Sequence, residues 1–358
     1  MTEKAKVRRR KAKVKRLKTE RGDLDAGRPV SPSSNKSPTH SSRKSSASSS
    51  RKPSVPSSSQ KSLASSSRKS VAIVGAGRLG TALASALDAC GYEVRALVSR
   101  GAAGARHAAA RAGLKTLALG AGELERLPSV ELLFLTTPDD ALKEMTRSLA
   151  SLTEARARVA LHTSGALSSE RLAPLRARGY QIGSMHPLAA VSETRAGAQS
   201  LRRAFYCVEG DAAAVRAARR VVRDLGGRSF TIGAEDKALY HAAAVMTAGH
   251  VVALFDTALD TLRRCGLTNP RAREVLLPLL RSTDENLSTQ TPERALTGSF
   301  ARADVETVTK HLEALRGLRD SDALATYVAL GEHSLKLALR AGASPEAVAR
   351  VRRALSKA

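Results

Sequence analysis

Tryptophan is absent from the 358-residue chain, and aromatic residues make up only 3% of it. Proteins that hold single-stranded nucleic acid stack its bases on aromatic side chains, so the sequence excludes such a platform in a folded domain. Cysteine is scarce as well, because Cys90, Cys207 and Cys265 lie far apart and form no CxxC pair. This pattern suits neither a disulfide framework nor a zinc site. We therefore expect no metal site and a reducing, cytoplasmic setting.

The sequence also lacks a long hydrophobic run. Its first residues are rich in Lys and Arg and contain no apolar segment of the kind found in a secretory signal. The longest apolar stretch, His241–Phe255, includes two histidines and stops before Asp256. It is shorter than the roughly 20 residues that a membrane-spanning helix needs. We expect no membrane span and interpret this stretch as a buried helix.

Positive charge is concentrated at the N-terminus. Residues 1–70 hold 20 Lys and Arg against 4 Asp and Glu, and so carry most of the net charge of +26. Residues 1–69 contain a basic run, Lys4 to Lys18, and then a stretch rich in Ser, Pro, Lys and Arg. Too few apolar residues are present to offset the entropy of ordering, which predicts a disordered tail. Two interpretations stay open: an arm that binds nucleic acid or another anionic surface, or a solvated leader without a partner.

From Ser70 to residue 233, apolar strands alternate with helical segments. Val71–Val74 is a continuous apolar run, as in a strand buried on both faces of a parallel sheet. A glycine-rich turn, a helix that ends near Gly91 and a second strand come next within about 30 residues, the length of a βαβ unit. The predicted strands are residues 71–74, 93–98, 130–136, 159–162, 181–185, 205–209 and 229–232. The alternation predicts an α/β domain over residues 70–233 with a doubly wound sheet.

Strand patterns disappear after residue 233. Helical periodicity predicts helices over residues 236–265, 270–287, 304–318, 322–340 and 345–356. Pro270, Pro292 and Pro345 stand where the first residue of a helix is expected, directly after Asn269, Thr291 and Ser344. Residues 234–358 are therefore predicted to form an all-α C-terminal domain.

The turn after the first strand carries three glycines, in Gly75-Ala76-Gly77-Arg78-Leu79-Gly80. Gly75 permits a tight turn, Gly77 lets the backbone approach a pyrophosphate, and Gly80 lets the helix pack close to the strand. The N-terminus of the next helix offers free N–H groups and the positive end of its dipole to the phosphates. The strand before the motif and the helix after it supply the context that the motif needs. We predict a Rossmann-type domain that binds a dinucleotide through all six residues.

The end of the second strand bears on which dinucleotide is bound. Enzymes that use NAD usually place Asp or Glu there, to accept a hydrogen bond from the ribose 2′-hydroxyl. This chain has Val98-Ser99-Arg100 instead, so no carboxylate repels a 2′-phosphate. Arg100, with Ser99 beside it and Arg78 in the glycine loop, is suited to pairing with that phosphate. The pattern favours NADP over NAD, although two solvent-facing arginines would produce the same sequence.

A second candidate segment, Thr136-Thr137-Pro138, directly follows a buried strand. The carboxyl ends of parallel strands face the ligand crevice of an open α/β sheet. We therefore expect these residues to line the nicotinamide side of the groove. Asp139, which comes next, is interpreted as a helix cap rather than as a catalytic acid.

Ser164 and His186 are the first two candidate catalytic residues. Hydride transfer to a C=O or C=N bond needs a proton donor near the nicotinamide. Ser164 lies past a strand end in a turn with Gly165, where its hydroxyl would polarise the reacting atom. His186 follows a strand, precedes Pro187 and is of a type that titrates near neutral pH. A histidine that only holds a backbone carbonyl beside a turn is the competing interpretation.

Lys237 and His241 are the other two candidates. They are four residues apart at the start of the first C-terminal helix and so share one of its faces, with Tyr240 beside them. If this face closes over the cleft, it brings a cation and two hydrogen-bonding groups to the cofactor. A helix that merely packs between domains would show the same pattern.

Three segments together resemble a known family. They are Leu161-His162-Thr163-Ser164-Gly165-Ala166-Leu167, Gly183-Ser184-Met185-His186-Pro187-Leu188 and Asp236-Lys237-Ala238-Leu239-Tyr240-His241-Ala242-Ala243-Ala244. They resemble motifs of bacterial Rossmann-like proteins whose C-terminal half is a domain of unknown function. Such proteins look like relatives of pyrroline-5-carboxylate reductase, prephenate dehydrogenase and the β-hydroxyacid dehydrogenases. The resemblance implies an NADP-linked oxidoreductase, and the His-Pro pair of the prephenate-type enzymes favours His186. One departure is Gly249, where family members often carry Asn.

We thus expect an NADP-dependent reductase or dehydrogenase that acts on a small, anionic metabolite, with Arg302 as a candidate for its carboxylate. Related helical domains commonly pair, and residues 234–356 offer much apolar helix surface, which predicts a homodimer through the helical domain. The alternative is a non-catalytic dinucleotide-binding regulator or scaffold. The altered Asn position favours that alternative, whereas His186 and the Tyr-His helix favour the enzyme.

Overall fold

The computed structural model describes residues 69–318 and 322–358. These residues belong to one unit of the chain, which begins at Ser65. The tail predicted to be disordered, with its suggested role as a nucleic-acid or anionic-surface arm, lies outside the described residues except for Lys69.

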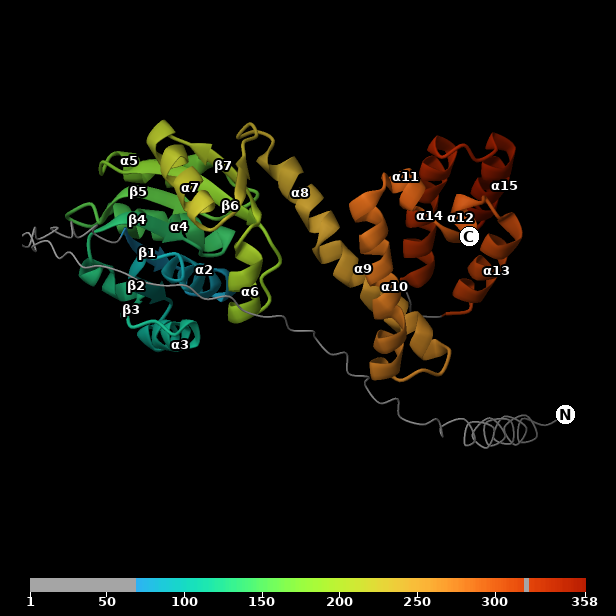
Figure 1. The fold of residues 1–358 in the computed structure, drawn as a ribbon, viewed down its shortest axis with the longest axis horizontal. Helices are drawn as coiled ribbons and strands as arrows, with labels where there is room; N and C mark the ends of the chain where they lie inside the picture. The colour runs from blue at the N-terminus through green and yellow to red at the C-terminus, as the bar shows by residue number, and fades with distance from the viewer. Residues whose placement is uncertain (1–68, 319–321) are drawn as a thin grey trace, which may run out of the picture. The chain divides into compact units, whose positions relative to one another are not determined.

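An eight-stranded sheet forms the first part of this unit (Figure 1). Its strands are β1 (Ser70–Val74), β2 (Glu93–Ser99), β3 (Leu117–Gly120), β4 (Val130–Leu135), β5 (Ala157–His162), β6 (Gln181–Leu188), β7 (Phe205–Gly210) and β8 (Arg228–Phe230). They lie in the order β3-β2-β1-β4-β5-β6-β7-β8. Strands β6 and β7 are antiparallel, and every other neighbouring pair is parallel. The chain changes direction across the sheet at β1, where the crevice of a doubly wound sheet opens.

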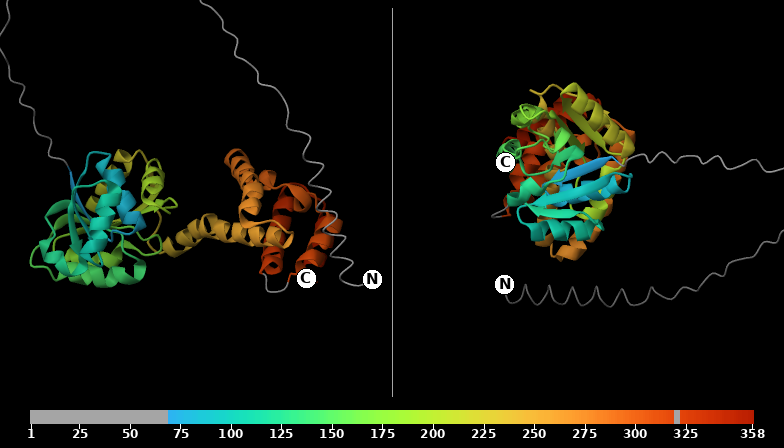
Figure 2. Two further views of the ribbon diagram at one scale, coloured as in Figure 1. Left: turned by 90° about the horizontal axis from the view of Figure 1, so that it is seen from below. Right: turned by 90° about the vertical axis from the view of Figure 1, so that its left-hand side faces the viewer.

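Helices cover both faces of the sheet (Figures 1 and 2). They are α2 (Arg78–Asp88), α3 (Ala102–Ala112), α4 (Asp139–Ala150), α5 (Ala173–Arg176), α6 (Thr194–Leu201) and α7 (Ala212–Asp224), with 3₁₀ turns at Ala121–Arg126 and Ser169–Leu172. Because side chains alternate along a strand, Val71 and Ile73 enter one apolar core while Ala72 and Val74 enter the other. The predicted α/β domain is thus confirmed. Strand β3 and the antiparallel direction of β7 were not predicted from the sequence.

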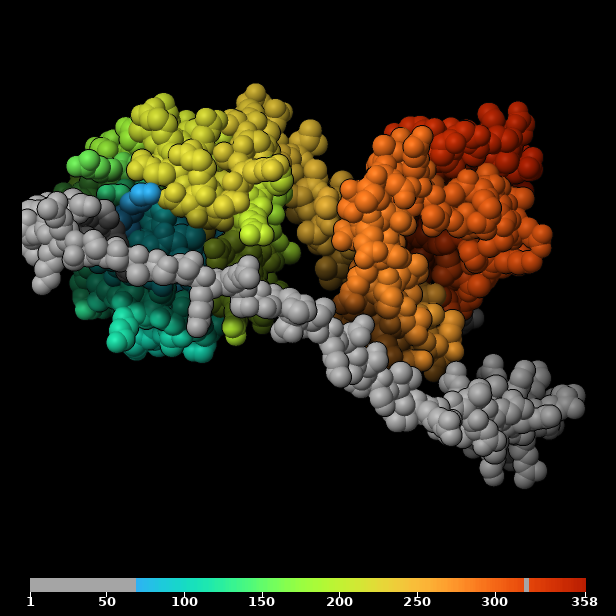
Figure 3. Space-filling view, in the orientation of Figure 1, coloured from blue at the N-terminus to red at the C-terminus, as the bar shows by residue number. Residues whose placement is uncertain are grey.

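Helices alone come after β8 in the described residues. They are α8 (Lys237–Thr247), α9 (Gly249–Arg264), α10 (Asn269–Thr289), α11 (Pro292–Ala295), α12 (Gly298–Ala301), α13 (Val305–Arg316), α14 (Ala323–Arg340) and α15 (Pro345–Leu355). Helices α13, α14 and α15 share a core that includes Val308, Leu335 and Val351, and their packed surface is orange to red in Figure 3. The predicted helical C-terminal part is therefore confirmed.

The prediction that His241–Phe255 is a buried helix is wrong. This stretch lies in α8 and α9, which contain no buried residue except Lys237, and Leu239 and Val252 are 75% and 70% exposed. Together the two helices form one apolar helical stretch of 28 residues, Lys237–Arg264, which by length and composition could cross a membrane. Apolar composition alone does not say whether the chain itself covers a helix face, and here it does not.

Candidate functional site

The loop between β1 and α2 has a shape that glycine alone allows at two positions. Gly75 has φ +109°, and a Cβ on it would lie 2.6 Å from the Thr136 carbonyl carbon. A Cβ on Gly80 would lie 2.2 Å from the Gly75 carbonyl oxygen. The Thr136 hydroxyl donates to that same oxygen at 2.7 Å, which ties the loop to the end of β4. The tight turn and the close helix–strand packing expected of Gly75 and Gly80 are both present.

Gly77 differs from the other two glycines because the space beside it is open. A Cβ on it would meet nothing closer than the Gly75 carbonyl oxygen at 4.0 Å. Gly77 is the N-cap of α2, and no side chain caps the helix. The first N–H groups of a helix have no partner within the helix, so they are available here to an anion. The loop therefore fits a pyrophosphate group.

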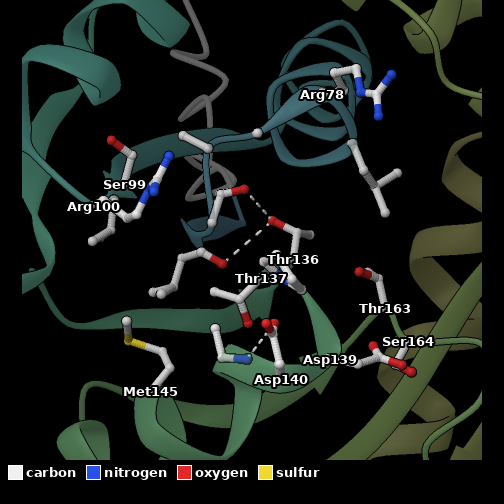
Figure 4. A pocket seen from close by; sticks show the side chains of 18 of the residues that line it. Arg78, Ser99, Arg100, Thr136, Thr137, Asp139, Asp140, Met145, Thr163 and Ser164 are labelled. Atoms are coloured by element: carbon white, nitrogen blue, oxygen red, sulfur yellow. Dashed lines mark hydrogen bonds between the residues drawn. The ribbon is translucent and has the colours of Figure 1, made fainter.

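A groove of about 1200 Å³ runs from this loop along the carboxyl ends of the strands. Figure 4 shows Ser99 and Arg100 on one side of it, Thr136 and Thr137 in the middle, and Thr163 and Ser164 on the other side. Its lining also includes His186 and His241. One continuous groove thus joins the glycine loop to three of the four candidate catalytic side chains.

The arginine side of the groove is open and basic. Arg78 and Arg100 both line it and are exposed, and no acidic residue ends β2. The Ser99 hydroxyl donates to the Gly101 carbonyl at 2.8 Å, which fixes the turn that leads into α3. The N-terminus of α3 therefore lies beside Arg100, with Gly101 and Gly104 also lining the groove. This is a suitable place for a phosphate on a ribose.

Thr136, Thr137 and Pro138 line the groove, and that they face the nicotinamide stays a prediction. The Thr137 hydroxyl is buried and has no hydrogen-bond partner within the described residues. The expectation that Asp139 caps a helix is wrong, because Pro138 is the N-cap of α4 and Asp139 lies in the first turn. A carboxylate in the first turn still complements the helix dipole without being the cap.

Ser164 lies in a turn that other groups hold in place. Its backbone N–H donates to His162 Nδ1 at 3.1 Å, and its hydroxyl oxygen accepts from the Leu167 N–H at 3.0 Å. The other ring nitrogen of His162 lies 3.0 Å from the Ser168 carbonyl, so it carries the proton and donates. Burial lowers the pKa of His162 to about 3, with Lys237 acting in the same direction. His162 is therefore a neutral brace of the turn, and the Ser164 hydroxyl keeps its own proton to donate.

Lys237 lies behind this turn and does not line the groove. Its side chain is 1% exposed, and its ammonium group donates to the Ser184 hydroxyl at 2.7 Å and to the Ser164 carbonyl at 3.2 Å. A Glu209 carboxylate oxygen lies 3.8 Å away, and Glu209 also accepts from the backbone and hydroxyl of Ser169. Burial lowers the pKa of Lys237, while Glu209 opposes that effect. The cluster fixes both ends of the Ser164–Ser169 segment.

His186, Tyr240 and His241 meet where β6 approaches α8. The Tyr240 hydroxyl lies 2.7 Å from His186 Nδ1, and the His186 and His241 rings are edge to face at 5.4 Å. A Cβ on Gly165 would lie 2.7 Å from His186 Nε2 and 2.3 Å from His241 Nδ1, so only glycine leaves room for both rings. Burial, with smaller effects of His241 and Lys237, lowers the pKa of His186 to about 4. His186 is therefore neutral near pH 7, rather than titrating there as its type suggests.

Most of the predicted site residues lie along one groove. Ser164, His186 and His241 line it, as do the predicted cofactor residues except Gly80, which lies beneath the loop. Sequence reasoning missed Ser184 and Glu209 as the partners of Lys237. The signal for Glu209 was a single carboxylate at the end of an otherwise apolar strand.

Comparison with protein families identifies both halves of the chain. Residues 55–187 match a Rossmann-like domain, and residues 204–334 match a domain of unknown function, DUF2520. The chain thus combines a Rossmann-like domain with a DUF2520 domain, which confirms the resemblance carried by the three sequence motifs. No curated protein matches the sequence.

Solved structures share the fold at low identity. Protein TM1727 from Thermotoga maritima is 22% identical, with a TM-score of 0.57 over 76% of this chain and 99% of its own. BF3122 from Bacteroides fragilis, a proposed NADP oxidoreductase, is 22% identical, with a TM-score of 0.62 over 75% and 98%. A pyrroline-5-carboxylate reductase from Coxiella burnetii is 15% identical, with a TM-score of 0.46 over 79% and 97%. At these identities the first two structures establish the fold and nothing further.

Proposed function

We propose that this protein is an NADP-dependent oxidoreductase, a reductase or dehydrogenase, that acts on a small metabolite. One observation carries the proposal: a single groove joins an open glycine loop at a helix N-terminus to Ser164, His186 and His241. BF3122, which shares the fold, is itself a proposed NADP oxidoreductase. We also propose that the protein works in the cytoplasm.

The preference for NADP rests on the arginine side of the groove. A 2′-phosphate carries negative charge, so Arg100 and Arg78 would pair with it, and the N-terminus of α3 would favour it as well. An NAD-type carboxylate at the end of β2 is absent, since Ser99 stands there. The 2′-hydroxyl of NAD would leave the arginines without that partner.

Bound NADPH would supply a hydride to the carbon of the acceptor. The chain orients the acceptor and stabilises the negative charge that develops on its oxygen or nitrogen, which then takes a proton from solvent water. If the Tyr240 hydroxyl donates to His186 Nδ1, the proton of the neutral ring is on Nε2, the nitrogen beside Gly165. His186 Nε2–H and the Ser164 hydroxyl then both donate toward the oxygen or nitrogen of a C=O or C=N bond. Because the pKa of His186 lies near 4, the ring acts as a neutral hydrogen-bond donor and not as an imidazolium.

Lys237 does not face the cofactor as the sequence suggests. It donates to the Ser164 carbonyl from behind, so we propose that it positions the Ser164 turn. Arg302, the candidate for the carboxylate of an anionic metabolite, does not line the groove either. The basic residues that do line it, Arg78 and Arg100, belong to the proposed phosphate side.

We further propose that α8, α9 and α10 pair with a second copy of the chain. Leu239, Met246, Val252 and Leu279 are 62% exposed or more, and so many large apolar side chains exposed on three successive helices are typical of an interaction surface. Asp256 and Asp260 interrupt the same helical stretch, which disfavours a lipid environment. Val252→Glu and Leu279→Glu should each halve the mass measured by light scattering, whereas Arg353→Glu on α15 should not. A wild-type monomer, or wild-type protein that pellets with phospholipid vesicles, would contradict the pairing.

The oxidoreductase proposal is tested by following NADPH absorbance across a panel of small carbonyl and imine compounds. His186→Asn should abolish turnover of any compound found, with NADPH affinity and melting temperature unchanged. If NADPH binds and every compound in the panel is inert, the non-catalytic dinucleotide-binding regulator is the better account. If NADPH does not bind, both accounts fail.

A further inference from the structure

A second cavity, of about 620 Å³, adjoins the groove. It lies between the end of β6 with the residues directly after it, Phe230 at the end of β8, and the α8–α9 junction. His186 and His241 line both cavities, so the two meet at these rings. A substrate atom held beside these two rings would therefore have the groove on one side and the second cavity on the other.

The walls of the second cavity are apolar. Leu188, Phe230 and Val245 are its large apolar side chains, and most of its other residues are alanine or glycine. Space is left because Ala244, Ala248 and Gly249 carry little or no side chain where α8 meets α9. A Cβ on Gly249 would touch only Val245, at 3.7 Å.

Among the residues that the structure describes, no Lys, Arg, Asp or Glu lines this cavity. Its polar side chains are His186, Tyr240, His241 and Thr247. The Tyr240 hydroxyl is already hydrogen-bonded to His186. The pKa of His186, near 4, leaves that ring uncharged at neutral pH. The ammonium of Lys237 is 1% exposed and engaged with Ser184. A carboxylate or phosphate in this space would lose part of its hydration and gain no ion-pair partner from Lys or Arg, which disfavours an anion there.

We propose that the second cavity is the substrate pocket and that it takes the uncharged, apolar body of a carbonyl or imine compound. The C=O or C=N bond lies beside the His186 and His241 rings, and the hydrocarbon part extends toward Phe230 and the α8–α9 junction. The substrate class is thus a neutral compound with a compact apolar substituent, in place of the anionic metabolite expected from the sequence. This inference rests on the proposed oxidoreductase function.

The test compares two ligands of matched shape on the full chain saturated with NADP⁺, which prevents turnover. 4-Methylcyclohexanone is neutral, and 4-oxocyclohexane-1-carboxylate replaces its methyl group by a carboxylate. Binding is measured by saturation-transfer NMR and by calorimetric titration. We expect the neutral ketone to bind about tenfold or more tightly than the carboxylate.

Two variants locate the binding. Ala244→Leu fills the cavity from α8 and should weaken binding of the neutral ketone about tenfold, with NADP⁺ affinity unchanged. Ala242→Leu is the matched control, because Ala242 is on the same helix, is exposed and does not line the cavity. It should bind the ketone as the wild type does.

Three results would overturn the inference: equal or tighter binding of the carboxylate, no detectable binding of the ketone up to its solubility limit, or equal effects of the two variants. Each of them leaves NADP⁺ binding intact, so it would remove the substrate class and not the dinucleotide site. Loss of NADP⁺ binding itself, measured in the same titrations, would instead remove the proposed function.

Discussion

Replacing Gly77 or Gly80 by alanine should have different effects: the first on NADPH affinity, the second on the stability of the fold. A methyl group on Gly77 would enter open space, with its nearest neighbour 4.0 Å away. The same methyl on Gly80 would lie 2.2 Å from the Gly75 carbonyl oxygen and 2.5 Å from the Thr136 hydroxyl. The two substitutions add the same atom, yet one meets only the space left for a ligand and the other meets the chain itself.

These distances set the expected magnitudes. Gly80→Ala must displace backbone, and overpacking of this kind costs about 1–3 kcal/mol. For a domain of this size, each kcal/mol lowers the melting temperature by roughly 2–4 °C. Gly77→Ala replaces an N-cap glycine and should cost at most about 1 kcal/mol in stability. Its methyl group would hold a pyrophosphate away from the helix N-terminus, so NADPH affinity should fall about tenfold or more.

Differential scanning fluorimetry and calorimetric titration with NADPH measure both quantities on the same samples. Gly122→Ala is a suitable control, since a Cβ at that position meets nothing within 4 Å and Gly122 does not line the groove. The reasoning is refuted if Gly77→Ala binds NADPH as tightly as the wild type. It is equally refuted if Gly77→Ala melts lower than Gly80→Ala.

Three further predictions concern single residues. Arg100→Ser should weaken NADPH binding about tenfold in calorimetric titration and leave NADH binding unchanged, because Arg100 is proposed to contact only the 2′-phosphate, which NADH lacks. Equal losses of affinity for the two dinucleotides would contradict the assignment. Lys237→Met should lower the turnover rate while NADPH affinity holds, and Lys237→Arg should restore part of it, since either cation can donate to the Ser164 carbonyl; unchanged turnover in the Met variant would remove the positioning role. Burial lowers the pKa of His162 to about 3, below its value in the unfolded chain, so its stabilising effect is complete above about pH 6.5 and is lost as the pH falls toward 3. Urea denaturation should show a loss of about 1.4 kcal/mol per pH unit from this group across that range, and a flat profile would contradict the buried neutral ring.

The sequence predicted best what depends on neighbouring residues. The strand at Val71–Val74, the glycine turn and the helix after it are set by local preference and spacing, and the structure contains all of them. Strand β3, Leu117–Gly120, contains no β-branched or aromatic residue, so its sequence does not indicate a strand. The antiparallel direction of β7 depends on how α6 returns the chain to the sheet, and no residue of β7 records it.

The site shows the same division. Helical spacing correctly put Lys237 and His241 near one another, but it could not say that Lys237 would point inward to Ser184 while His241 lined the groove. Only the fold brings Ser184 and Glu209 to Lys237 across 53 and 28 residues of chain. The exposure of α8 and α9 was missed for a related reason, since an apolar helix face has the same sequence whether its own chain or another molecule covers it.

The central claim is that the groove of this chain binds NADPH for hydride transfer, and one titration tests it most directly. NADPH and NADH are each titrated calorimetrically into the full chain at the same salt concentration. The account predicts one site per chain for NADPH, with NADH bound more weakly. Equal or tighter binding of NADH would contradict the assignment of Arg100, and no heat of binding from either dinucleotide would contradict the function itself.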